Sequence, residues 1–239
     1  MKTLEEQERL LMEEWKIRWK AQHGEYEHFN GDGIVDYDRW NQIPAGKHIL
    51  VVLKETNGLT TDLTSFLGHG GNGTYHRTWN NVARWVHMIL NDQYLDRIPR
   101  EVLDDTVKNI AAINIKKYPG GPRANNQTVR DEAMKDRDLI KRQIALYAPD
   151  IILTGGWGLL SDFLRDQVLQ DSAPWYDPRK RENLEEEPNL WYFWTTKARE
   201  GKPTLLISMP HPNRAGKKWT WELKKVLERE AVGLESLGR

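Results

Sequence analysis

The chain has 239 residues, with 35 lysines and arginines against 35 aspartates and glutamates, so its formal net charge is zero. This balance argues against a strongly basic nucleic-acid binder, and the 11 tryptophans argue against a disordered chain, in which aromatic residues are few. The absence of cysteine excludes disulfide bonds, thiolate nucleophiles, cysteine-ligated zinc and cysteine-ligated iron–sulfur clusters.

The N-terminal region has the pattern of a helix followed by loops. Leucines and tryptophans near helical spacing predict a helix over residues 3–22, and repeated glycines predict loops over residues 23–46. This region lacks the apolar core of a signal peptide, and no apolar run in the chain approaches the roughly 20 residues of a membrane helix. We therefore expect a cytoplasmic protein with no membrane partner.

Four short apolar runs rich in β-branched residues have the pattern of buried strands. They are residues 48–53, 110–115, 150–154 and 204–208. Helical patterns follow them or lie between them, at about 79–91, 127–147, 158–169 and 217–230. This alternation predicts an α/β fold, a three-layer α/β/α arrangement around a central, mostly parallel four-stranded sheet.

The chain shows no internal repeat, low-complexity segment or linker, so we expect one domain over residues 1–239. Within it, residues 1–46 form an N-terminal extension of helix and loop, and residues 171–202 form a polar and aromatic insertion. The run Trp191–Trp194 inside this insertion is a candidate for an extra edge strand.

Polar residues follow the predicted strands, at the edge where parallel sheets bind ligands. Glu55 comes after the first strand and could orient or deprotonate a water, although it could instead cap a helix or pair with Lys54. Asn114 ends the second strand, where an amide suits reading the edge of a base or bonding to neighbouring backbone. His211 lies between two prolines after the fourth strand and could donate to a developing anion, or fill core or surface space.

Two other motifs do not carry a site. Residues 30–33 (NGDG) resemble the middle of a calcium loop, but Arg39 occupies the position where a carboxylate is required. Residues 68–73 are glycine-rich but lack the GK[ST] of a phosphate-binding loop, which favours a lid or a point of close backbone approach. The histidines lack metal-ligand spacing, so we expect neither a metal nor a cofactor.

Taken in order, the strand ends resemble the motifs of the uracil-DNA glycosylase superfamily. Ile113–Arg123 (INIKKYPGGPR) is similar to its TN-x-x-K-x-x-P-x-x-x-R segment, and His211–Asn213 (HPN) is similar to its HPS motif. Residues 140–156 match its helix-then-strand segment, and residues 55–58 (ETNG) occupy the place of its GEAPG-type motif. The resemblance covers about residues 47–225 and is closest to the thermostable, iron–sulfur branch. This chain has no cysteine for that cluster.

The resemblance implies a role for several residues. Glu55 would position the attacking water, Asn114 would read the pyrimidine edge, and His211 would stabilise the departing base. The alignment also places Tyr75 near the aromatic residue that stacks on the base. The family motif positions no lysine as a Schiff-base nucleophile, although Lys54 leaves that option open.

The departures from the family pattern concern the substrate. Lys54 and Asn57 stand where the family has glycine and proline, and Asn213 replaces the serine of HPS, so Thr56 or Asn57 could share the role of positioning the water. Gly58 occupies the place of a tyrosine that lies against C5 of the base in uracil-specific relatives. An open C5 side and a polar lysine favour a base other than plain uracil.

Positive charge is concentrated near the predicted site. Residues 111–142 and residues 211–225 each carry an excess of four positive charges, whereas residues 1–40 carry an excess of four negative charges. The zero net charge is therefore a sum of unlike regions and does not exclude DNA. Six basic residues flank the strand ends and are expected to contact DNA phosphates: Lys116, Lys117, Arg123, Arg214, Lys217 and Lys218.

The sequence favours a monomeric, monofunctional DNA glycosylase that hydrolyses the N-glycosidic bond of a flipped pyrimidine and leaves an abasic site. The altered motifs slightly favour a modified cytosine in foreign DNA, as in anti-phage defence, over uracil. Two alternatives stay open: a non-catalytic nucleic-acid-binding or sensor protein on the same fold, and a nucleotide or nucleoside hydrolase.

Overall fold

Four parallel strands form the centre of the sheet in the computed structural model, which describes residues 2–24, 28–68 and 73–236. The strands are β2 (Ile49–Leu53), β3 (Ala111–Asn114), β4 (Ile151–Gly155) and β6 (Thr204–Met209). Every residue in them is buried, as their continuous apolar sequences require for strands covered on both faces. The predicted α/β class and the four strand positions are confirmed.

The prediction of a four-stranded sheet is wrong in its strand number, because the described residues form six strands in the order β1-β3-β2-β4-β6-β5. β1 (Gly33–Ile34) pairs antiparallel with β3, and β5 (Trp191–Thr195) pairs antiparallel with β6. β1 is only two residues long and lies in a glycine-rich stretch, so no alternation marks it as a strand. β5 confirms the expected edge strand, and the whole sheet is mixed.

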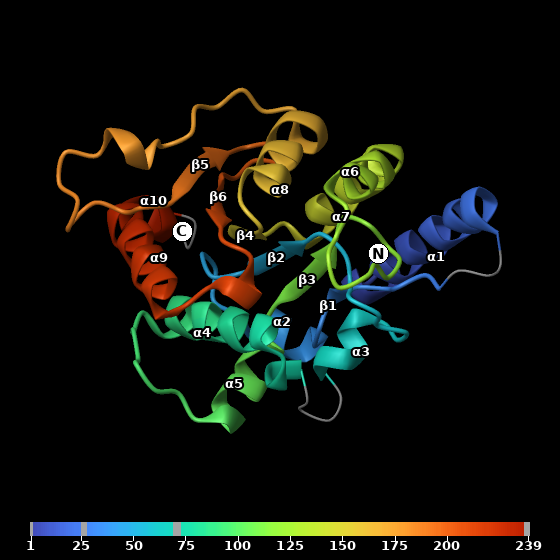
Figure 1. The fold of residues 1–239 in the computed structure, drawn as a ribbon, viewed down its shortest axis with the longest axis horizontal. Helices are drawn as coiled ribbons and strands as arrows, with labels where there is room; N and C mark the ends of the chain where they lie inside the picture. The colour runs from blue at the N-terminus through green and yellow to red at the C-terminus, as the bar shows by residue number, and fades with distance from the viewer. Residues whose placement is uncertain (1, 25–27, 69–72, 237–239) are drawn as a thin grey trace.

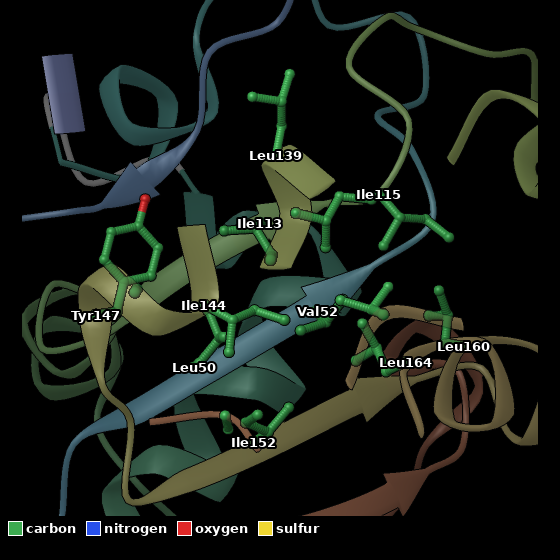
Figure 2. Packing of buried hydrophobic residues seen from close by; sticks show 14 of the residues in the cluster. Leu50, Val52, Ile113, Ile115, Leu139, Ile144, Tyr147, Ile152, Leu160 and Leu164 are labelled. Atoms are coloured by element: carbon green, nitrogen blue, oxygen red, sulfur yellow. The ribbon is translucent and has the colours of Figure 1, made fainter. Parts of the chain in front are cut away.

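One face of the sheet packs against α1 (Leu4–His23), α7 (Arg137–Tyr147) and α8 (Gly158–Asp162), which continues into the π-helical segment η2 (Phe163–Leu169). Alternate strand residues point to the same face and therefore share one cluster with these helices. Figure 2 shows this cluster, which includes Leu50, Val52, Ile113, Leu139, Ile144, Ile152, Leu160 and Leu164.

The other face packs against α4 (Arg77–Asn91), α5 (Arg100–Thr106) and α9 (Lys217–Arg229), as Figure 1 shows. Ile49 and Val51 of β2 enter this second cluster with Val82 and Val86 of α4. Three shorter helices lie at the periphery: α2 (Tyr37–Gln42), α3 (Leu63–Gly68) and α10 (Ala231–Ser236). No helix in the described ranges is both long and apolar enough to cross a membrane.

The single helix expected over residues 127–147 is two helices, α6 (Asn126–Lys135) and α7. The break lies at Asp136, whose backbone leaves helical geometry at φ −108° and ψ 14°. The carboxylate of Asp136 accepts a hydrogen bond of 2.8 Å from the indole of Trp15 on α1. This long-range contact stabilises a break that helical periodicity does not reveal.

The insertion over residues 171–202 is built into the edge of the sheet (Figure 1). The backbone N–H of Tyr176 donates to the carbonyl of Tyr192 in β5 at 2.8 Å. Two further bonds of 2.7 Å tie the insertion to the C-terminal region, from the Asn189 N–H to Glu222 and from the Trp194 indole to Glu230. The insertion therefore covers the β6 edge of the sheet.

Candidate functional site

The carboxyl ends of β2, β3 and β6 meet at a cavity of about 310 Å³. The cavity brings together seven of the residues predicted from the sequence to form a site: Lys54, Glu55, Thr56, Asn57, Asn114, His211 and Asn213. Parallel strands place their carboxyl ends at one edge of a sheet, which explains how segments separated by about 60 and 100 residues converge.

The segments that follow β2 and β3 continue side by side beyond the sheet. The N–H of Lys116 donates to the carbonyl of Lys54 at 3.0 Å, and the N–H of Gly120 donates to the carbonyl of Thr56 at 2.8 Å. The N–H of Gly58 then donates to the carbonyl of Gly120 at 3.2 Å. These bonds fix Glu55 against the segment that begins at Lys116.

The Glu55 carboxylate is held between a lysine and a glycine. Its Oε2 lies 2.5 Å from Nζ of Lys116, and the two side chains are 8% and 4% exposed. A Cβ added at Gly120 would lie only 2.0 Å from Oε1 of Glu55, so any larger residue there would displace the carboxylate. Glu55 therefore pairs with Lys116 and not with Lys54, the partner considered in the sequence.

The prediction that Lys116 contacts DNA phosphates is wrong in this conformation. Besides its contact with Glu55, the Lys116 ammonium donates to the backbone carbonyl of Tyr118 at 3.1 Å. The ammonium also lies 3.6 Å from the centre of the Tyr118 ring. A lysine with these buried contacts orients Glu55 and has no free face for a phosphate. The sequence motif identified a positive charge at Lys116 but did not reveal that this side chain is buried against Glu55.

Asn114 is buried at the end of β3, and its side chain lines the cavity. Its backbone N–H donates to Oδ2 of Asp32 at 2.7 Å, which fixes the backbone at this position. The side-chain nitrogen Nδ2 is buried and has no hydrogen-bond partner among the described residues. Leaving such a donor unpaired costs free energy, so the cavity is suited to a ligand with an acceptor at this point.

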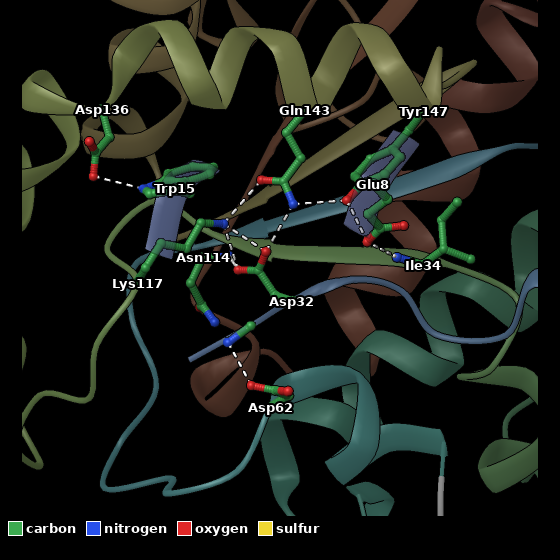
Figure 3. Close-up of polar contacts among 11 residues, drawn as sticks. Glu8, Trp15, Asp32, Ile34, Asp62, Asn114, Lys117, Asp136, Gln143 and Tyr147 are labelled. Carbon is green, nitrogen blue, oxygen red and sulfur yellow. Dashed lines mark hydrogen bonds and ion pairs between the residues drawn. The ribbon is translucent and has the colours of Figure 1, made fainter. Parts of the chain in front are cut away.

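Asp32 is the centre of a buried polar network behind Asn114 (Figure 3). Nζ of Lys117 lies 2.6 Å and 2.8 Å from its two oxygens, and Nε2 of Gln143 donates to it at 2.9 Å. Lys117 also lies 4.2 Å from the ring centre of Trp15. Burial lowers the pKa of Lys117, and Asp32 opposes that shift.

The prediction that Lys117 contacts DNA is also wrong, because its side chain is 1% exposed and points into the protein. The ion pair with Asp32 instead couples the end of β3 to α7 through Gln143. Lys117 thus supports the cavity wall from behind.

The network extends to Glu8 on α1. Tyr147 and the backbone N–H of Ile34 donate to Oε1 of Glu8 at 2.9 Å and 3.2 Å. Tyr37 donates to Oε2 of Glu8. Burial raises the pKa of Glu8 to about 7, in spite of these hydrogen bonds, and the negative charge of Asp32 contributes further. Glu8 therefore changes its protonation near neutral pH.

Glu8 makes stability depend on pH. The folded-state pKa of about 7 exceeds the ordinary 4.5. The contribution of Glu8 to the free energy of unfolding is therefore complete below pH 4.5 and is lost as the pH rises through 7. We expect wild type to lose about 3 kcal/mol of unfolding free energy relative to Glu8→Gln over this range. Chemical denaturation of both proteins measures the difference. A constant difference across the range would contradict the prediction.

His211 lies at the mouth of the cavity, after β6. Its Nδ1 accepts the backbone N–H of Asn213 at 3.2 Å, so the neutral ring carries its proton on Nε2. Partial burial lowers the pKa of His211, and the nearby charges of Lys54 and Arg214 lower it further. The ring is therefore a neutral donor at pH 7.

The other residues of the first motif have distinct surroundings. Burial lowers the pKa of Lys54, whose ammonium donates to Oδ1 of Asn126 at 2.8 Å. The hydroxyl of Thr56 donates to Oδ1 of Asn30 at 2.8 Å, which directs its proton away from a water in the cavity. Asn57 lines the cavity and is exposed, so of these two residues its side chain is the freer to hold a water.

Tyr75 does not line the cavity. Its side chain is 69% exposed, and the Arg100 guanidinium lies 2.7 Å from the centre of its ring. Phe66 on α3 and Trp79 on α4 are instead the aromatic residues of the cavity wall. Gly58 also lies outside the lining, and a Cβ added there would meet nothing within 4 Å.

The cavity residues that the sequence did not single out lie between residues 59 and 79, after β2. They are Leu59, Leu63, Phe66, His76, Arg77, Thr78 and Trp79. An aromatic residue in a polar stretch was the available signal for Phe66, whose ring lies 5.3 Å from that of His76. Residues 69–72, most of the glycine-rich stretch expected to form a lid, lie outside the described residues.

Four of the six predicted DNA-binding residues are exposed: Arg123, Arg214, Lys217 and Lys218. Lys217 pairs with Asp96 at 2.5 Å, and Lys218 lies 5.3 Å from the ring centre of Trp219. Arg77 adds an exposed positive charge at the cavity itself. Positive charge is therefore present at the cavity, from Lys54 and Arg77 in its wall and from Arg214, whose charge acts on His211.

No protein-family model and no curated protein matches this chain. Within the described ranges, no three histidine, aspartate or glutamate residues are grouped so that they could hold a metal ion.

Proposed function

We propose that this protein is a DNA glycosylase that hydrolyses the N-glycosidic bond of a flipped pyrimidine and leaves an abasic site. The observation that carries the proposal is the cavity in which Glu55, Asn114 and His211 meet, with the amide donor of Asn114 unpartnered. A carboxylate, a buried amide and a neutral imidazole are the groups that such a hydrolysis needs.

Each group has a defined task in the proposed reaction. The Asn114 amide donates to an acceptor on the base, and Phe66 provides the nearest aromatic surface. The glycosidic bond breaks with its electron pair leaving on the base, and Nε2–H of His211 stabilises that negative charge. A water oriented by Glu55 adds to C1′ and gives up a proton, which neutralises the departing base.

The surroundings of the cavity favour a modified cytosine over plain uracil. Lys54 adds a polar cation to the wall, and Gly58, which follows Asn57 of the wall, carries no side chain that could restrict the base. An enzyme with this preference acts on foreign DNA, consistent with anti-phage defence in the cytoplasm. The proposal includes a monomeric protein of three-layer α/β/α arrangement, which is supported by helices against both faces of the sheet.

DNA would approach over the exposed basic residues at the mouth of the cavity. We infer that the exposed residues Arg123, Arg214, Lys217 and Lys218 contact phosphates on either side of a flipped nucleotide, together with Arg77 at the cavity. Binding through phosphates releases counterions, so it weakens steeply as salt rises.

One observation favours a non-catalytic sensor as a second candidate. The ion pair with Lys116 occupies one oxygen of Glu55 and leaves only the other for a water. A sensor would bind DNA in a salt-dependent manner, and its binding would survive Glu55→Ala and His211→Ala without any base release by wild type.

The test is an assay for alkali-labile abasic sites on matched duplexes that contain uracil, 5-hydroxymethylcytosine or glucosylated 5-hydroxymethylcytosine. We expect wild type to release a modified cytosine faster than uracil, and Glu55→Gln to abolish release while binding persists. Absence of base release from every duplex would overturn the proposal and favour the sensor.

Asn114→Ala is expected to lower kcat/KM for base release about tenfold, the value of one hydrogen bond worth about 1.4 kcal/mol. The Asn114 amide nitrogen has no partner in the described part of the protein, so the substitution removes a bond to substrate that the free protein does not make. Steady-state kinetics measure the loss, and thermal unfolding checks that the variant is folded. Unchanged kinetics would show that Asn114 does not contact the base.

A further inference from the structure

A second cavity, of about 520 Å³, opens at the same edge of the sheet, between α8 and the start of β5. In the sheet, Trp191 of β5 lies opposite Ser208 of β6, which places both near the carboxyl end of β6. The lining consists of Trp157, Gly158, Ser161, Asp162, Trp175, Trp191 and Ser208. Apart from Trp191, which the sequence marked only as a strand, none of these residues was predicted to have a role.

Three tryptophans line this cavity: Trp157, Trp175 and Trp191. Trp157 has a positive φ of 58°, which is rare for a bulky residue and costs free energy. The N–H groups of Gly156 and Trp157 both donate to the carbonyl of Met209 at 3.0 Å and hold this conformation. The fold thereby keeps a partly exposed indole at the cavity wall, edge-on to Trp219 at 5.0 Å.

The cavity also contains polar groups whose hydrogen bonds are incomplete. Asp162 is exposed and has no hydrogen bond or ion pair with any described side chain; partial burial raises the pKa of its carboxyl, and the nearby charge of Arg165 opposes this shift. The indole nitrogen of Trp175 is buried and has no partner in the described ranges. Ser161 and Ser208 share one hydrogen bond of 3.0 Å, which leaves further capacity on both oxygens.

These groups select the chemistry of the occupant. A phosphate or carboxylate would meet the unpaired charge of Asp162. An ammonium would be repelled by two arginines that already lie over the indole rings. The guanidinium of Arg165 lies 5.3 Å from the Trp175 ring centre, and that of Arg179 lies 4.8 Å from the Trp191 ring centre. A wholly apolar ligand would leave the polar groups unpaired. A neutral ring with apolar faces and several hydroxyls satisfies all of them.

We propose that this second cavity binds a pyranose ring, with its C–H faces against the tryptophans and its hydroxyls on Asp162, Ser161 and the Trp175 indole. The sugar comes either as a free saccharide or as a substituent of the target base. The second source rests on the proposed glycosylase function, because the base would have to occupy the first cavity.

The walls of the two cavities approach each other at Gly156 and Lys54. Gly156 precedes Trp157 in the second cavity, and a Cβ added at Gly156 would lie 3.3 Å from Cε of Lys54 in the first. The Gly156 backbone therefore lies beside the flexible Lys54 side chain at this point. A sugar attached to the base could extend past them.

The first experiment titrates the protein with methyl glucoside and follows tryptophan indole N–H signals by NMR. We expect the Trp175 signal to move in the millimolar range, and Asp162→Asn or Trp157→Ala to weaken binding about tenfold. Trp221→Ala is the matched control, because Trp221 is 45% exposed, compared with 37% for Trp157, and lies on α9 outside the cavity.

The second experiment measures base release from duplexes with glucosylated and unglucosylated 5-hydroxymethylcytosine. If the sugar is carried by the base, Trp157→Ala and Asp162→Asn lower release from the glucosylated duplex about tenfold and leave release from the other unchanged. If the source is a free saccharide, the NMR shift appears without this selectivity. Absence of both the shift and the selectivity overturns the proposal.

Failure of the proposed function is distinguishable from failure of this inference. The saccharide titration needs no DNA and no base release, so a shift at Trp175 supports the sugar site even if every duplex stays intact. Wild type could instead release bases from unglucosylated DNA while neither Trp157→Ala nor Asp162→Asn changes release from the glucosylated duplex. That result would support the glycosylase proposal and contradict a sugar site that acts on the base.

Discussion

Gly120→Ala is expected to lower base release about 100-fold in a protein that still folds. The added methyl would occupy the position of the Glu55 carboxylate, because the ideal Cβ lies 2.0 Å from its Oε1 and 2.5 Å from its Oε2. A carboxylate moved by about 1 Å no longer aligns a water with C1′, and misplacement of this size costs about 100-fold in rate. Single-turnover kinetics on the preferred duplex measure the effect.

The expected cost to stability is smaller, at about 1 to 3 kcal/mol, as for other substitutions that overfill a packed site. Gly121→Ala is the matched control, because a Cβ at Gly121 would meet nothing within 4 Å. It adds the same methyl one residue away and is expected to keep wild-type kinetics. Equal activity of the two variants would show that the Glu55 carboxylate does not set the rate.

The sequence was sufficient to locate the cavity because its motifs lie at strand ends. Continuous apolar runs marked the central strands, and the geometry of parallel sheets brings their carboxyl ends together. Glu55, Asn114 and His211 were selected on this ground, and the structure places all three in one cavity. The same argument says nothing about edge strands, so β1 was missed.

The direction of charged side chains could not be predicted in the same way. Lys116 and Lys117 are adjacent in a basic segment, yet each finds a buried carboxylate distant in sequence, Glu55 and Asp32. A count of positive charge cannot distinguish a buried pair from an exposed phosphate contact, because only the fold brings such partners together. Arg123 and Arg214 have the exposure that the sequence led us to expect.

The aromatic wall shows a further limit of sequence reasoning. Tyr75 was selected by a loose alignment across a glycine-rich stretch, where small changes in loop length move every later residue. The structure places Phe66 in the cavity and stacks Tyr75 against Arg100. The α3 helix that positions Phe66 has only six residues, too few for periodicity to predict it.

Lys117→Met is expected to reduce the free energy of unfolding by about 3 to 5 kcal/mol, the usual cost of removing one partner from a buried ion pair. Asp32 and Lys117 have side-chain exposures of 0% and 1%, so the remaining carboxylate would stay out of water without its cation. Asp32 would keep hydrogen bonds from Gln143 and from the Asn114 backbone, which cannot neutralise its charge. Urea denaturation of the variant and wild type measures the loss.

Two comparisons distinguish the stability lost through the uncompensated buried charge from the stability lost when any lysine or arginine is replaced. Arg142→Met removes a partner from the exposed pair with Glu14, whose side chains are 52% and 45% exposed, and is expected to cost less than about 1 kcal/mol. Adding Asp32→Asn to Lys117→Met removes the uncompensated charge, so the double variant should be more stable than Lys117→Met alone. Equal losses for Lys117→Met and Arg142→Met, or a double variant less stable than Lys117→Met, would show that the buried charge is not what destabilises the protein.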